Sequence, residues 1–130
     1  MIGEAVERAV AIVGDDAGMR DSVAVLLELH GFRVRQFARA EAFLAEALPA
    51  DAVAAAELGC LVLDLSQPGM TGLDLLERLA AAGAPPPSIL ISAEVTAPVA
   101  ERAHTAGARL VLGRPVPPLE LVAHVRALAG

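Results

Sequence analysis

Residues 60–79 read CLVLDLSQPGMTGLDLLERL and hold one complete strand, loop and helix. The apolar run 60–63 ends at Asp64, a pattern typical of a strand that is buried on both faces of a sheet. A loop with proline and glycine follows, and leucines then recur at helical spacing. The segment therefore predicts a strand and a helix with a carboxylate at their junction.

The same alternation extends in both directions along the chain. Short apolar or alternating runs predict five strands, the second of them at a sheet edge, at residues 9–13, 33–37, 60–63, 88–91 and 110–112. Helical patterns, closed by glycines or by Pro49, lie between and after them at residues 19–27, 40–48, 73–79, 98–106 and 119–128. Apolar strands that alternate with helices predict a doubly wound α/β fold with a parallel sheet.

The length and composition fit one packed domain. The 130 residues are 55% hydrophobic and 20% charged, which is enough apolar content for a core. We expect a single domain over residues 1–130, with its core at about 9–128 and no linker or output domain among them. The first residues lack a signal-peptide pattern, and no apolar run approaches the ~18–20 residues of a membrane span. A cytoplasmic location without membrane contact is therefore expected.

Charge and residue content argue against several classes of protein. A net charge of −6 opposes contact with phosphate backbones, and three phenylalanines without Trp or Tyr provide no platform for base stacking. We therefore expect no direct binding of nucleic acid. Cys60 is the single cysteine, which excludes a disulfide framework and a zinc site built from cysteines. It is interpreted as a small buried hydrophobic residue.

Polar side chains directly follow four of the predicted strands. Asp15 and Asp16 follow the first strand, Asp64 the third, Ser92 the fourth and Arg114 the fifth. In doubly wound sheets the ligand site lies beyond the carboxyl ends of the strands, so these residues should converge. Carboxylates can hold Mg²⁺, and a hydroxyl and a guanidinium can bind phosphate oxygens. A central carboxylate can itself be phosphorylated, so the set indicates phosphoryl transfer to Asp64.

Several segments, in order and with matching spacing, carry a resemblance to a known family. They are the Asp-x-x-x-Pro-Gly-x-x-Gly pattern that begins at Asp64, ISAE at 91–94, Asp15 with Met19-Arg20, AGA at 106–108 and Arg114-Pro115. From about residue 9 to residue 128 the chain resembles the receiver domain of two-component response regulators, which is CheY-like. The stretch AEAFL at 40–44 and Pro98 resemble receivers that precede LuxR-type helix-turn-helix outputs.

The resemblance implies a fold and a set of roles. The fold would be flavodoxin-like, with a five-stranded parallel sheet in the order 2-1-3-4-5 and five helices. Asp64 would accept a phosphoryl group from a histidine kinase or a small phosphodonor, assisted by Ser92 and Arg114. Mg²⁺ would be held by Asp15, Asp64 and the backbone carbonyl of Ser66, with Asp16 as a further candidate. Such a protein relays a signal and is not a turnover enzyme.

Three positions depart from the pattern of the family. Gly14 stands where the first acid of an acidic pair is usual, and its absence should weaken Mg²⁺ binding. Arg114 replaces a lysine, and its planar guanidinium could bridge Asp64 or hold a phosphoryl group bidentately. Val111 replaces an aromatic switch residue, so the relay to the output face should be altered. By the resemblance we also expect a cis bond between Arg114 and Pro115.

The resemblance also predicts a partner face on the fourth helix, fifth strand and fifth helix. An exposed Val111 and an alanine-rich helix would suit packing against a homodimer partner, an output domain or an output protein. The predicted members of this face are Val99, Arg102, Arg109, Val111 and Arg126.

Two other interpretations remain open at this point. The first is a phosphorylation-independent pseudo-receiver that acts as an interaction module, which the residues Gly14, Arg114 and Val111 favour. The second is a small flavodoxin-like enzyme or nucleotide binder. It would need a glycine-rich phosphate loop after the first strand, but two acids lie between Gly14 and Gly18.

Overall fold

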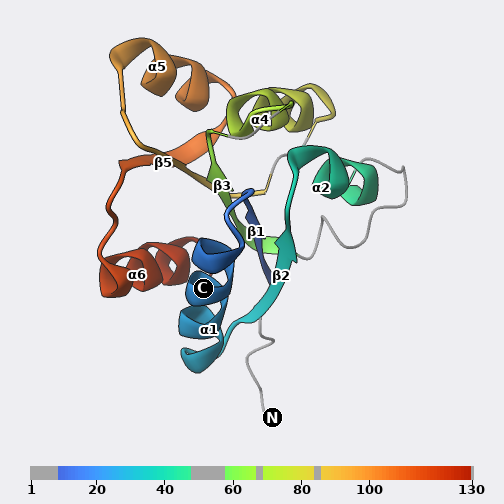
Figure 1. Ribbon diagram of the computed structural model, residues 1–130. Coiled ribbons are helices and arrows are strands. Elements are labelled where there is room, and N and C mark those ends of the chain that lie inside the picture. The colour runs from blue at the N-terminus through green and yellow to red at the C-terminus, as the bar shows by residue number, and fades with distance from the viewer. Residues whose placement is uncertain (1–8, 48–57, 67–68, 84–85, 130) are drawn as a thin grey trace.

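The computed structural model describes residues 9–47, 58–66, 69–83 and 86–129, which form one parallel sheet with helices on both faces (Figure 1). The strands are β1 (Ala9–Val13), β2 (Arg33–Phe37), β3 (Leu58–Asp64), β4 (Ser88–Ser92) and β5 (Ala108–Gly113). The helices are α1 (Ala17–Leu29), α2 (Ala40–Ala47), α4 (Gly72–Ala81), α5 (Ala97–Thr105) and α6 (Pro118–Ala129). The strand order is β2-β1-β3-β4-β5, which confirms the predicted order and the predicted edge position of residues 33–37.

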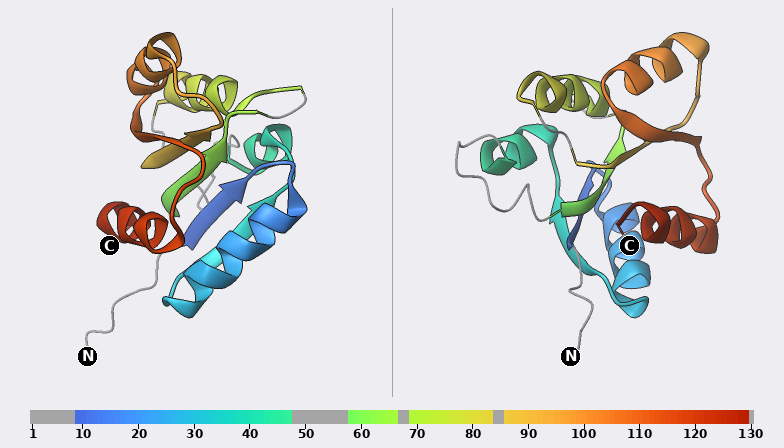
Figure 2. Two further views of the ribbon diagram at one scale, coloured as in Figure 1. Left: turned by 60° about the vertical axis from the view of Figure 1, so that its left-hand side comes forward. Right: turned by 180° about the vertical axis from the view of Figure 1, so that it is seen from behind.

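Helices cover the sheet unequally on its two faces. Helices α1 and α6 lie on one face, and α2, α4 and α5 lie on the other (Figures 1 and 2). Side chains of a strand point alternately to opposite faces, so each central strand supplies both layers. In β1, Ala11 and Val13 join the cluster under α2, α4 and α5, whereas Val10 and Ile12 join the cluster under α1 and α6.

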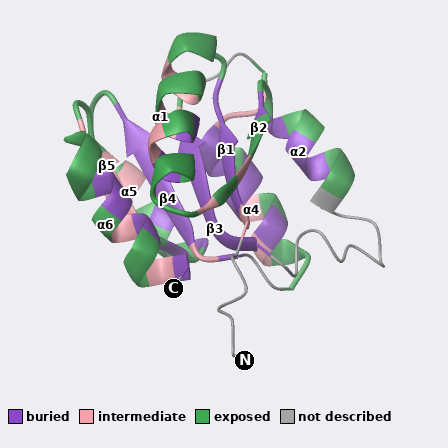
Figure 3. Ribbon diagram, turned by 90° about the horizontal axis from the view of Figure 1, so that it is seen from below, coloured by how far each residue is buried: buried purple, intermediate pink, exposed green. Residues whose placement is uncertain are grey.

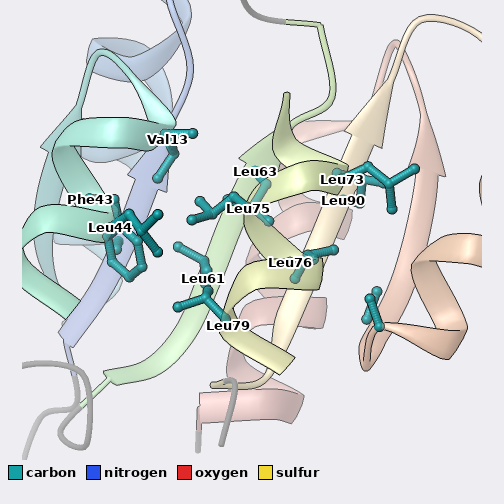
Figure 4. Close-up of a cluster of buried hydrophobic side chains, with 14 of the residues drawn as sticks. Val13, Phe43, Leu44, Leu61, Leu63, Leu73, Leu75, Leu76, Leu79 and Leu90 are labelled. Atoms are coloured by element: carbon teal, nitrogen blue, oxygen red, sulfur yellow. The ribbon is translucent and has the colours of Figure 1, made fainter. Parts of the chain in front are cut away.

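Strand β3 lies at the centre of the molecule. All seven of its residues are buried, which explains its nearly continuous apolar sequence, and in Figure 3 its ribbon is purple like those of β1 and β4. The leucines of α4 pack against β3 and its neighbours, with Leu75 and Leu76 fully buried (Figure 4). A fully buried leucine typically contributes about 1.5–3 kcal/mol of transfer free energy, so this face of α4 anchors the helix.

The ends of the helices follow from local side chains. Asp16 is the N-cap of α1, and its Oδ1 accepts a hydrogen bond from the backbone amide of Met19 at 3.1 Å. Gly31 follows the end of α1 with a φ of 94°, a conformation that favours glycine. Thr71 and Asp74 form a capping box that begins α4.

Strands β3, β4 and β5 are longer than the sequence predicts, whereas β1 and β2 have the predicted bounds. Strand β3 begins at Leu58 instead of residue 60, because the backbone of Leu58 pairs with Ala9 despite the intervening glycine. Strand β5 begins at Ala108 instead of residue 110, since Ala108 pairs with Ser88. The predicted end of the second helix at Pro49, and Pro68 of the loop motif, lie outside the described residues.

Candidate functional site

The register of the sheet brings the predicted site residues to one edge. Val13 pairs with Leu63, Asp64 with Ile91, and Ser92 with Gly113. The residues that follow β1, β3, β4 and β5 therefore emerge side by side at the carboxyl edge of the sheet. This confirms the predicted convergence, although the chain positions are far apart.

Asp64 is the last residue of β3 and is almost fully buried, with 3% of its surface exposed. Its Oδ1 accepts a hydrogen bond from the backbone amide of Ser66 at 3.0 Å. Its Oδ2 accepts a hydrogen bond from Nη2 of Arg114, and the two side chains form an ion pair. A buried carboxylate needs such partners, because leaving the charge uncompensated is costly.

Arg114 reaches this position from the end of β5. Its backbone amide donates to the carbonyl of Ser92 at 2.9 Å, which fixes the end of β5 beside the end of β4. The peptide bond between Arg114 and Pro115 is cis, as expected. The side chain of Arg114 is 39% exposed, whereas Asp64 is buried. The guanidinium therefore lies between Asp64 and the solvent. The possibility that arginine bridges Asp64 directly is therefore realised in this structure.

Ser92 is buried at the end of β4, with its hydroxyl engaged locally. The hydroxyl donates to the carbonyl of Glu94 at 2.8 Å and accepts from the amide of Glu94 at 3.2 Å. Both contacts belong to a turn just after the strand. A phosphate contact by Ser92 would therefore require the hydroxyl to exchange its Glu94 carbonyl partner for another acceptor.

The acidic residues after β1 have different surroundings. Asp15 is exposed and lines an open hollow of about 640 Å³ together with Ser66, Thr71 and Arg102. Asp16 caps α1 through its Oδ1, the local role that an acid at this position typically has. Asp15 therefore borders the same hollow as Leu65 and Ser66, which follow β3.

The residues at this edge offer oxygen donors of the kind that a hard cation prefers. In the described part of the chain, no group of three or more His, Cys, Asp or Glu side chains is placed to hold a metal ion. Asp15, Asp64 and the carbonyl of Ser66 offer the oxygen types that Mg²⁺ prefers, since the ion typically uses one or two carboxylates with waters and phosphate oxygens. Arg114 already binds one of the Asp64 oxygens, so a cation would compete with the guanidinium.

Gly14 lies directly against Asp64. A Cβ atom at this position would lie 3.3 Å from Cβ and 3.9 Å from Oδ2 of Asp64. The carbonyl of Gly14 accepts a hydrogen bond from Nη1 of Arg20, a half-buried side chain of α1. A carboxylate at residue 14 would thus add negative charge beside Asp64, and the glycine provides none.

The loop between β3 and α4 has a contact that the sequence did not reveal. The backbone amide of Met70 donates to Oε2 of Glu41, at the start of α2, over 3.2 Å. Hydrogen bonds to its own backbone amide and to that of Met70 lower the pKa of Glu41 below its usual value. The two residues are 29 positions apart, and no sequence pattern links them. Met70 also packs against the core.

The predicted partner-face residues differ in their surroundings. Val111 and Val99 are half-buried and pack against the core, so the expectation of an exposed Val111 is wrong. The cause is that β5, although at the sheet edge, is flanked by α5. Arg109 is exposed.

Two arginines of that set are engaged within the chain. Arg102 of α5 forms a bidentate ion pair with Glu77 of α4, at 2.9 Å and 3.2 Å, which ties the two helices together. Arg126 of α6 donates to the carbonyl of His30 at 3.2 Å and stacks over the ring of Phe32. Both guanidinium groups are thus directed toward neighbouring elements of the same chain.

The chain matches a known protein family over most of its length. The family described as the response regulator receiver domain matches residues 10–126.

In the described residues, none of the helices has the length and apolar character needed to cross a membrane.

Curated relatives and solved structures agree with this match. The transcriptional regulatory protein FixJ of Azorhizobium caulinodans is 37% identical over 121 residues, covering 93% of this chain and 54% of the relative. The response regulator protein TmoT of Ectopseudomonas mendocina is 34% identical over 120 residues, covering 92% of this chain and 52% of the relative. The crystal structure of FixJ-N superposes with a TM-score of 0.80 at 32% identity, covering 96% of this chain and 94% of that one. The chain spans about half the length of these curated relatives.

Proposed function

The chain belongs to the response regulator receiver family, and from this premise we propose that Asp64 accepts a phosphoryl group in a two-component phosphorelay. The observation that carries the proposal is the placement of Asp64. It is a buried carboxylate at the end of the central strand, with a guanidinium and a hydroxyl at the ends of the next two strands. The phosphoryl donor would be a histidine kinase or a small phosphodonor.

The transfer is a displacement at phosphorus. A carboxylate oxygen of Asp64 forms a bond to phosphorus while the P–N bond of the donor phosphohistidine breaks, and the imidazole leaves with the electron pair of that bond. Arg114 releases Oδ2 of Asp64 and binds the phosphoryl oxygens, for which its planar fork is suited. The Ser92 hydroxyl gives up the Glu94 carbonyl and donates to a phosphoryl oxygen.

Asp15, Asp64 and the carbonyl of Ser66 are proposed to hold Mg²⁺. When bound, the ion would offset the negative charge of the phosphoryl oxygens during transfer. Asp16 caps α1 and is a weaker candidate ligand for that reason. With Gly14 in place of an acid and Arg114 on Asp64, we expect this binding to be weak.

Relay of the signal is proposed to pass from Ser92 through the turn at Glu94 to the face formed by α5, β5 and α6. The hydroxyl now holds that turn, so its release would free the segment that leads into α5. Val111 has no ring that could swing, and a small shift of α5 would carry the change. This face would then contact an output domain, an output protein or a second copy of the chain.

A phosphorylation-independent pseudo-receiver is the second candidate. The engagement of both Asp64 oxygens and of the Ser92 hydroxyl supports it, because these groups already have partners in the unmodified protein. In that case the domain would act as a protein-interaction module.

Binding of beryllofluoride with Mg²⁺ separates the two candidates. We expect the amide NMR signals of Ser66, Ser92 and Glu94 to shift on addition of both, and an Asp64→Asn variant to show no such shifts. A wild-type spectrum that stays unchanged at saturating beryllofluoride and Mg²⁺ would favour the pseudo-receiver.

A further inference from the structure

A carboxylate from outside the loop after Asp64 holds that loop in place. Glu41 lies in the first turn of α2, on the face of the sheet that also carries α4 (Figures 1 and 2). Its Oε2 accepts a hydrogen bond from the backbone amide of Met70 at 3.2 Å. The contact joins α2 to the residues just before α4.

The neighbouring residue is also fitted to this carboxylate. Gly69 has a φ of 78°, and a Cβ atom built on it would lie 2.8 Å from Oε2 of Glu41. A larger residue at position 69 would therefore both strain the backbone and displace the carboxylate. Glu41 lies at the surface, and both Gly69 and Met70 border its carboxylate.

Two further contacts lie in the described residues on either side of this one. At the start of the loop, the amide of Ser66 donates to Oδ1 of Asp64. At its end, Thr71 and Asp74 form the capping box of α4. Glu41 acts just before that box, where an ionised acceptor makes a hydrogen bond stronger than a neutral one would be.

We propose that Glu41 is a positioning residue, which holds the backbone at Gly69 and Met70 and thereby supports the proposed metal site at Asp64 and Ser66. The proposal rests on the metal site of the proposed function. Glu41 would not touch the metal ion or the phosphoryl group, and would act through the backbone at Gly69 and Met70.

The test compares Glu41→Ala with two matched variants by two independent measurements. Glu41→Gln keeps an acceptor oxygen without the charge. Glu46→Ala removes a carboxylate of the same helix that pairs with Arg35 and does not reach the loop. Hydrogen exchange of the Met70 amide reports the contact itself, without any metal ion. Calorimetric titration with Mg²⁺ reports the site, and thermal unfolding confirms that each variant is folded.

For Glu41→Ala we expect both faster exchange of the Met70 amide and weaker Mg²⁺ binding, each by about fivefold, the ratio that one ordinary net hydrogen bond supplies. Glu41→Gln should recover much of both losses, and Glu46→Ala should match the wild type. An unchanged rate of hydrogen exchange at the Met70 amide in Glu41→Ala would show that the contact does not form in solution. Faster exchange with unchanged Mg²⁺ affinity would overturn the positioning role alone. A wild-type chain that binds no Mg²⁺ would overturn the metal site of the proposed function, and the positioning role with it.

Discussion

The guanidinium of Arg114 lies directly on the carboxylate of Asp64, although the two residues are 50 positions apart. Asp64 is buried and Arg114 is partly exposed, so the arginine closes the site on its solvent side. A cation that binds Oδ2 of Asp64 would therefore compete with the guanidinium for this oxygen. This relationship determines how the site should respond to Mg²⁺.

Removing the charge of Arg114 should tighten Mg²⁺ binding. We expect Arg114→Ala to lower the Kd for Mg²⁺ by about tenfold, because a positive charge next to the ion and a competing ligand of Oδ2 are both lost. Arg114→Lys keeps the charge and should change the Kd much less. Calorimetric titration checks both, and an unchanged or higher Kd in Arg114→Ala would show that the guanidinium does not compete with the ion.

Adding a carboxylate at residue 14 should strengthen the same site. In Gly14→Asp the new Cβ would lie 3.3 Å from that of Asp64, so its carboxylate would add negative charge beside the proposed ligands. We expect the Kd for Mg²⁺ to fall by about tenfold, and the metal-free protein to be less stable through repulsion of like charges. Gly14→Asn has the same shape without the charge and is the control. Equal Mg²⁺ affinities of Gly14→Asp and Gly14→Asn would show that a missing negative charge at residue 14 does not weaken the site.

Gly72 is required by close packing at the start of α4. An added Cβ would lie 2.6 Å from the backbone oxygen of Asp64 and 3.1 Å from Cδ1 of Leu90. We expect Gly72→Ala to lower the free energy of unfolding by about 1–3 kcal/mol in urea titrations. Gly18→Ala, in the first turn of α1, should leave stability unchanged or raise it by up to about 1 kcal/mol. Similar effects in both would mean that the contact at Gly72 relaxes at little cost.

Cys60 should be inert in the folded protein. Burial raises the pKa of its thiol from 9.0 to about 12. At pH 8 we expect no reaction with a disulfide reagent until urea unfolds the chain. The folded chain keeps this proton where the unfolded chain loses it, so the free energy of unfolding should fall as pH rises from 9 toward 12. Rapid labelling of the folded protein at pH 8 would contradict the burial of Cys60.

The fold could be predicted because each strand carries its own pattern. The apolar runs of β1, β3 and β4 reflect burial on both faces, and the alternation in β2 reflects its place at the edge. The convergence of Asp64, Ser92 and Arg114 followed from the rule that parallel strands end at one edge. The boundaries of β3 and β5 were missed because backbone pairing extends them past the apolar run.

The contacts of single side chains were harder to predict. The pairing of Arg102 with Glu77 and of Glu41 with Met70 joins helices and loops that are 25 and 29 residues apart, and neither leaves a periodic signal. The burial of Val111 depends on the flanking helix, which a strand pattern alone does not report. Asp16 was a candidate metal ligand in the sequence, and the structure shows that it caps α1.

The phosphorylation of Asp64 is tested most directly by the intact mass of the chain after incubation with acetyl phosphate and Mg²⁺, beside an Asp64→Asn control. The proposed function predicts that the wild type gains the mass of one phosphoryl group and that the control gains none. A wild-type protein that is folded and gains no phosphoryl group, from acetyl phosphate or from a partner kinase, would contradict the account. Equal gain in the control would place the phosphoryl group on a residue other than Asp64.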